Sequence, residues 1–226
     1  MSAQQTPIAS LDEKISYFTE RLKLFGNVIG GWPLNLESTS QKKEIRALWE
    51  KDFSHALTLY KEYPNEIDAK LVVAELARMG HNIDVPDAAR KADLVLNEIF
   101  RIDQFNLRAM VCRASMYVSL APQFFPDAER LFAKVIELSS PSVDPIIYQG
   151  LGFACLHQNK IEAATSHFET YLSLVPNDEK ITQLLSQLKS GKRGEVVHVN
   201  GALSSTSVIP NTASNKPNEK PWWQFW

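Results

Sequence analysis

The stretch PIIYQGLGFACLHQNKIEAATSHFETYLSLVP, residues 145–176, decides the fold class of this chain. Its first half places Tyr148, Leu151, Gly152 and Cys155 three and four residues apart, which puts them on one face of an α-helix. Its second half centres on Ala164, which has large apolar residues at helical spacing around it. Glycine inside a helix costs about 1 kcal/mol relative to alanine, so Gly152 indicates close contact with a partner helix. The stretch therefore predicts two helices packed as a hairpin.

The second of these helices recurs with a period of 36 residues. Four alanines mark the copies, at Ala56, Ala92, Ala128 and Ala164. A large apolar side chain follows each alanine by four residues, at Tyr60, Leu96, Phe132 and Phe168. An alanine at a helix crossing lets two backbones approach, while its larger neighbours fill the space on either side. The pattern predicts one buried helical stripe repeated four times.

Other signals mark the ends of this array. Ser10 and Glu13 form a capping box for a helix that ends at Gly30, and residues 38–63 predict a long second helix. After Pro176, a single apolar stripe predicts a terminal helix that covers the last repeat, with Ile181, Leu184, Leu185 and Leu188. We therefore divide the chain into residues 1–65, a helical hairpin that could be a degenerate repeat, residues 66–190, and residues 191–226.

These residues resemble the tetratricopeptide repeat family. The family pattern W-x2-L-G-x2-Y, A-x3-F and P is matched at Tyr148, Leu151, Gly152, Cys155, Ala164, Phe168 and Pro176. The resemblance implies an all-α fold, a right-handed solenoid of antiparallel helical hairpins with a C-terminal capping helix and a disordered tail. It is similar to bacterial-type cytoplasmic adaptors and assembly factors. Two departures fall in turns: residues 79–86 lengthen one by about six residues, and residues 120–126 add two to another.

In this family, the first helix of each hairpin lines the inner groove. Matching positions extend from Asp68 onward and give a partner-binding groove of Leu71, Glu75, Arg78, Arg108, Val111, Ser115, Val118, Ile146, Gln149, Phe153 and Leu156. Members that grip a chaperone's terminal carboxylate use Lys, Asn and Arg at such positions, which this chain largely replaces. That clamp is therefore not expected, and the apolar residues Val111, Phe153 and Leu156 favour an apolar helix or extended segment as ligand. The alternative is that some of these residues only pack between neighbouring repeats.

The last 36 residues differ in composition from the rest of the chain. Residues 191–220 are rich in Ser, Asn, Gly and Pro, which predicts a flexible linker. An aromatic motif follows, with Trp222, Trp223, Phe225 and Trp226. Burying four aromatic side chains contributes roughly 6–12 kcal/mol, and fixing six residues costs a similar amount, so the motif needs a preformed surface. Three surfaces remain open: a partner protein, the body of this or a neighbouring subunit, and a membrane interface.

Composition limits the classes of partner and the compartment. With 24 basic and 26 acidic residues, the formal charge of −2 gives no electrostatic case for nucleic acid. The sequence contains neither a signal-peptide pattern nor a run of about 20 apolar residues, so we expect a cytoplasmic protein. Cys112 and Cys155 lack metal-site spacing and are expected to be free thiols in helices.

No catalytic constellation emerges from the sequence. The histidines lack metal-binding spacing and are expected on the surface or in turns, at His55, His81, His157, His167 and His198. We therefore predict no catalytic residue, no metal and no cofactor. The expected function is a non-enzymatic scaffold, an adaptor or assembly factor that binds other proteins through its groove and its aromatic tail. The alternatives are a chaperone that shields an apolar client segment and an accessory subunit of an enzyme complex.

Overall fold

The computed structural model describes residues 10–31, 34–36 and 38–190. Within these residues all regular secondary structure is helical, as the sequence predicted. The helices are α1 (Leu11–Ile29), α2 (Thr39–Glu62), α3 (Ile67–Asn82), α4 (Ala88–Ile102), α5 (Leu107–Leu120), η1 (Pro122–Phe124), α6 (Phe125–Ser139), α7 (Pro145–His157), α8 (Ile161–Leu174) and α9 (Glu179–Lys189).

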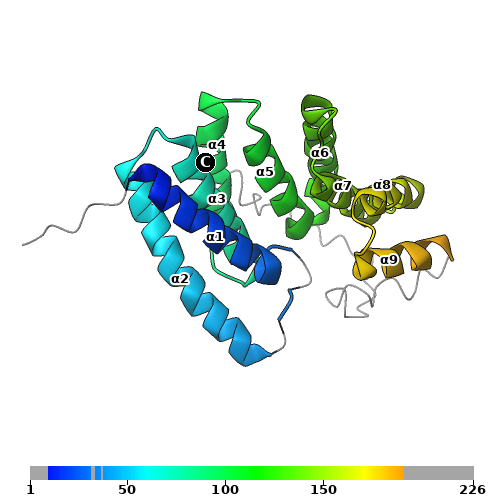
Figure 1. Ribbon diagram of the computed structural model, residues 1–226, viewed down its shortest axis with the longest axis horizontal. Helices are drawn as coiled ribbons and strands as arrows, with labels where there is room; N and C mark the ends of the chain where they lie inside the picture. Colours follow the sequence, from blue (N-terminus) through cyan, green and yellow to red (C-terminus); the bar gives the residue numbers. More distant parts are fainter. Residues whose placement is uncertain (1–9, 32–33, 37, 191–226) are drawn as a thin grey trace, which may run out of the picture.

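The helices follow one another through the molecule in chain order, from α1 and α2 at one end to α9 at the other (Figure 1). The closest packing lies within the pairs α3–α4, α5–α6 and α7–α8. The first helices of these pairs also touch one another, and α1 packs against α3 more extensively than against α2. The result is a row of α1, α3, α5 and α7 along one side of the molecule.

Side-chain caps fix where several helices begin. In α1, the Ser10 amide donates to Glu13 Oε2 at 2.7 Å and the Glu13 amide donates to Ser10 Oγ at 3.3 Å, which is the predicted capping box. In α7, Asp144 Oδ1 accepts from the Ile146 amide at 3.0 Å, and Pro145 occupies the first turn. These bonds satisfy amides that have no partner within the helix, so each start is encoded locally.

The alanine seam is confirmed. Ala56, Ala92, Ala128 and Ala164 are all fully buried, one in each of α2, α4, α6 and α8. The predicted close approach at Gly152 is also confirmed, because a Cβ there would lie 2.6 Å from a ring atom of Phe168. The α7 backbone therefore packs directly on this ring, and a small residue is required at the contact.

The two lengthened turns take forms that the repeat pattern did not predict. After Met79, α3 continues for three more residues to Asn82, and residues 83–87 form the turn. That turn contains Asp84 and Asp87 with positive φ, a conformation that Asp adopts more readily than most residues. The second insertion forms η1 ahead of α6.

Two apolar cores meet at α5. The first core extends from α1 to α5 and the second from α5 to α9, with Cys112 and Met116 in the first and Met110 and Ala114 in the second. The second core includes the predicted stripe of α9, whose four members are all buried. The helix α5 thus joins the two halves of the molecule, because it contributes side chains to both cores.

No helix in the described ranges is both long enough and apolar enough to cross a membrane.

Candidate binding groove

A groove of about 1180 Å³ lies along the row of first helices. Its lining comes from the C-terminal part of α1, the end of α3, the inner faces of α5 and α7, and two positions of α9. The α6 and α8 helices contribute Phe125, Phe132 and Ile161 at the edge of α7. Residues that are far apart in sequence therefore share one continuous surface.

Most of the predicted groove residues line this surface. They are Glu75, Arg78, Val111, Ser115, Val118, Ile146, Gln149, Phe153 and Leu156. The α5 and α7 positions form its middle, where the side chains are apolar or neutral and partly exposed. These positions of α5 and α7 therefore share one face, which lines the groove.

The prediction that Leu71 is exposed in the groove is wrong, because its exposed fraction is only 1%. Leu71 belongs to the first apolar core, where α1 packs against α3. Arg78 lines the groove but is 7% exposed rather than open to a ligand. The repeat pattern treats α3 as a free inner helix, and it could not show that α1 covers it.

Two polar side chains of α3 hydrogen-bond the C-terminal end of α1. Arg78 Nη1 donates to the carbonyl oxygen of Gly30 at 2.6 Å, and Asn82 Nδ2 donates to that of Ile29 at 2.8 Å. The last carbonyls of a helix have no donor within it, so these bonds satisfy groups that are otherwise unpaired. Arg78 also bonds Glu75 at 3.0 Å. Burial disfavours the charge of Arg78, but Glu75 and Cys112 outweigh it and raise its pKa.

The prediction that Arg108 lines the groove is also wrong. Arg108 lies outside the groove lining, where its Nη1 bonds Asp68 Oδ1 at 2.6 Å. Both side chains are more than half exposed, so this is a surface ion pair. The first turns of α3 and α5 are therefore tied to each other rather than directed at a ligand.

An aromatic cluster forms one wall of the groove. The Phe125 and His157 rings stack with centroids 4.8 Å apart, and Phe153 lies 6.5 Å from His157. Burial lowers the pKa of His157, which favours the neutral imidazole in this stack. His157 ends α7 and was expected on the surface or in a turn. The spacing of four residues between Phe153 and His157 is the signal that could have placed them on one face.

The residues at the two ends of the groove were not predicted from the sequence. At the α1 end, Asn27, Val28 and Asn35 belong to the lining, and at the other end Lys180 and Leu188 of α9 do. Leu188 was predicted only as part of the capping stripe. Whether the first helix and the last hairpins line the same groove depends on the curvature of the whole array, which local spacing does not specify.

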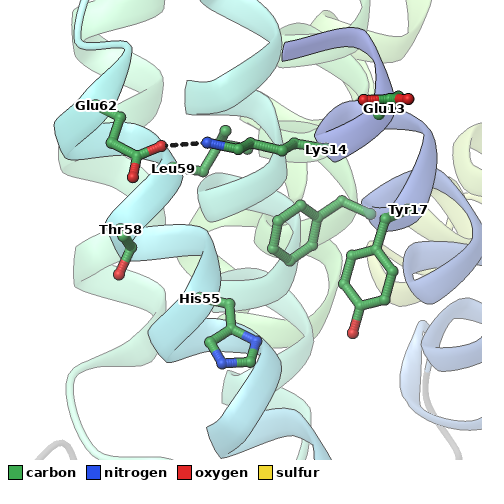
Figure 2. A pocket seen from close by; sticks show the side chains of 8 residues that line it. Glu13, Lys14, Tyr17, His55, Thr58, Leu59 and Glu62 are labelled. Carbon is green, nitrogen blue, oxygen red and sulfur yellow. Dashed lines mark hydrogen bonds and ion pairs between the residues drawn. The ribbon is translucent and has the colours of Figure 1, made fainter. Parts of the chain in front are cut away.

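A second, smaller pocket of about 370 Å³ lies between α1 and α2 (Figure 2). Phe18 and Leu59 are its buried apolar part, and the Lys14–Glu62 ion pair of 2.5 Å crosses its rim. The hydrogen bond to Glu62 raises the pKa of Lys14. Figure 2 shows His55 and Tyr17 pointing to the same side of the pocket. The pocket marks incomplete packing between two helices that touch little elsewhere.

Both cysteines are buried free thiols in helices, as expected. Burial raises the pKa of Cys155 to about 11 and that of Cys112 well above its usual value, so the reactive thiolate is disfavoured. Among the described residues, no three His, Cys, Asp or Glu side chains are grouped so that they could hold a metal ion. The aromatic motif at Trp222, Trp223, Phe225 and Trp226 lies outside the described residues.

Comparison of the chain with protein-family models, with curated proteins and with solved structures finds no match.

Proposed function

We propose that this chain is a non-enzymatic protein–protein interaction scaffold, an adaptor or assembly factor with helical hairpins arranged as in tetratricopeptide solenoids. Its groove binds an apolar helix or extended segment of another protein. The observation that carries the proposal is the groove itself, in which α5 and α7 present Val111, Val118, Ile146 and Phe153 on one side of the molecule. These side chains are not fully buried by any described helix.

The size and lining of the groove favour a peptide over a small metabolite. Small-molecule pockets measure roughly 300–1000 Å³, whereas this groove has about 1180 Å³ and its lining comes from seven α-helices. Ser115 and Gln149 are neutral polar groups between the apolar residues, and they can hydrogen-bond a peptide backbone or side chain. An amphipathic helix that presents apolar residues at successive turns matches this pattern.

The apolar middle of the groove also favours the chaperone alternative, in which the bound segment belongs to a client that is released later. The two proposals share one binding surface and differ in the role of the aromatic motif. An adaptor uses Trp222, Trp223, Phe225 and Trp226 as a second docking motif, whereas a chaperone needs the groove alone. An accessory subunit would be held in an enzyme complex through the same motif.

Selection from a library of 16-residue peptides tests the groove directly. We expect the full chain to enrich peptides with apolar residues at spacings of three and four, and Ile146→Glu to weaken their binding at least about tenfold. Leu174→Glu is the matched control, because Ile146 is 49% and Leu174 51% exposed, and Leu174 lies outside the groove. Equal loss in both variants, or no enrichment, would contradict the proposal.

A further inference from the structure

The final described helix ends beside the groove. Leu188 and Lys180 of α9 belong to the lining, and α9 ends at Lys189 with Ser190 as its C-cap. The chain continues from Ser190 for 36 more residues. The segment that follows therefore departs from a point two residues beyond a side chain of the groove.

We propose that the aromatic segment Trp222–Trp226 of the same chain occupies the groove and competes there with the partner's apolar segment. This inference rests on the proposed function of the groove and adds its regulation. The aromatic segment acts as an internal ligand, so a partner binds only by displacing it.

The connecting chain is long enough for this contact. Residues 191–221 comprise 31 residues and can span at most roughly 100 Å at about 3.3–3.6 Å per residue. A row of four helices whose axes lie about 8–10 Å apart measures roughly 30–40 Å across. Every part of the groove lies within reach of the segment. Covalent connection also raises the effective concentration of a tethered ligand, typically into the millimolar range.

The lining suits an aromatic ligand. The stacked rings of Phe125 and His157, with Phe153 beside them, offer faces and edges against which further aromatic rings pack favourably. Burying four aromatic side chains and ordering their backbone are opposing terms of similar size. A preformed surface and a tether are therefore the two conditions that such a segment needs, and this chain contains both.

The acidic side chains of the groove contribute little to this recognition. Both acidic side chains in the lining already have partners, Glu75 with Arg78 at 3.0 Å and Asp84 with Lys42 at 2.7 Å. The basic residues near the aromatic segment, Lys216 and Lys220, therefore find no unpaired carboxylate among the described residues of the groove. These two lysines are therefore not expected to make docking dependent on salt, whereas their attraction to an anionic membrane surface would depend on it.

Fluorine NMR of the full chain labelled with 5-fluorotryptophan tests the docking. The signals of Trp222, Trp223 and Trp226 are assigned by single Trp→Phe substitutions and compared with those of a synthetic peptide of residues 218–226. We expect chemical shifts different from those of the free peptide, which revert to free-peptide positions in Ile146→Glu and not in Leu174→Glu. Free-peptide positions in the unsubstituted chain overturn the proposal. So do shifts that depend on protein concentration, which indicate docking on a second copy, or that appear only with lipid vesicles.

A competition experiment distinguishes docking of the aromatic segment from the proposed function of the groove, on which it rests. A groove-binding peptide from the library is titrated into the full chain and into a variant with alanine at Trp222, Trp223, Phe225 and Trp226. We expect the variant to bind the peptide at least about tenfold more tightly, because the internal competitor is gone. Equal affinity overturns the competition and leaves the groove function intact. Absence of any peptide binding to either protein overturns both.

Discussion

The helices α3 and α7 are each the first helix of their hairpin, yet they are buried to different extents. α3 buries 12 of its 16 residues, whereas α7 buries 5 of its 13. Both pack on the second helix of their own hairpin and on α5. The difference is that α3 also packs against α1, so its inner face lies within the core, while that of α7 lines the groove. The position of a helix in the repeat therefore determines its neighbours within the array, but not whether another helix covers its inner face.

The two halves of the molecule also differ in how they accommodate charge. The four buried polar or charged side chains among the described residues all lie in the first half, at Asp52, Lys70, Arg78 and Asn82. Asp52 bonds Arg21 at 2.5 Å and Tyr17 at 3.0 Å, and Lys70 bonds Glu98. The second half relies on apolar packing around Gly152 and Phe168. The alanine seam runs through both halves, whereas buried polar side chains are found only in the first half of the described residues.

The largest effect should come from deleting one apolar side chain from the inner face of α3 and comparing it with one from the inner face of α7. We expect Leu71→Ala to lower the free energy of unfolding by about 3 kcal/mol, because it opens a cavity under α1. Ile146→Ala, in the half-exposed position of α7, should cost less than about 1 kcal/mol. Urea unfolding measures both values. Losses of equal size would contradict the conclusion that packing of α1 buries the inner face of α3 while that of α7 stays exposed.

Removing a buried charge should have the next largest effect. Asp52→Ala leaves Arg21 without its carboxylate, and we expect a loss of about 2 kcal/mol in the free energy of unfolding. The control is Asp68→Ala, which breaks the exposed pair with Arg108 and should change stability by less than about 0.5 kcal/mol. Urea unfolding measures the stability of both variants. An unchanged free energy of unfolding in Asp52→Ala would show that the buried polar contacts of the first half do not stabilise it.

Two glycines should respond to alanine in opposite directions. Gly152→Ala forces the Phe168 ring to move, and we expect a net loss of about 1 kcal/mol. A Cβ added at Gly26 in α1 would meet no packed neighbour within 4 Å, so Gly26→Ala should gain about 0.5–1 kcal/mol from helix propensity. Thermal unfolding gives the sign of each change, and the same sign for both would contradict the close contact at Gly152.

The smallest effect concerns pH. Burial lowers the pKa of His157 below its ordinary value of 6.5, so the folded state binds fewer protons than the unfolded state between these values. The resulting stability is fully present above about pH 6.5 and is lost as the pH falls through the lower folded pKa. We expect His157→Phe to reduce the loss between pH 7.5 and 5.5 by less than about 1 kcal/mol.

Urea unfolding at these two pH values measures that loss in both proteins. Burial also lowers the pKa of His167, so part of the pH dependence should persist in the variant. An identical loss in the two proteins would mean that the stacked imidazole is not held in its neutral form.

Local spacing predicted the secondary structure and much of the groove. The alanine seam, the capping box of α1 and the α9 stripe are short-range patterns, and each specifies its helix without reference to distant residues. The inner positions of α5 and α7 follow from the same spacing once hairpins stack. The extra turn of α3 was missed because repeat alignment counts residues between helices and does not distinguish a longer loop from a longer helix.

The sequence by itself determined where most of the helices lie and which side of each second helix is buried, because both depend on contacts within a few turns. Tertiary structure alone decided that α1 covers α3, that Leu71 leaves the groove for the core, and that Leu188 of α9 lines the far end of the groove. These outcomes depend on contacts between segments tens of residues apart. Their geometry accumulates from the packing of every intervening helix, so no local pattern contains it.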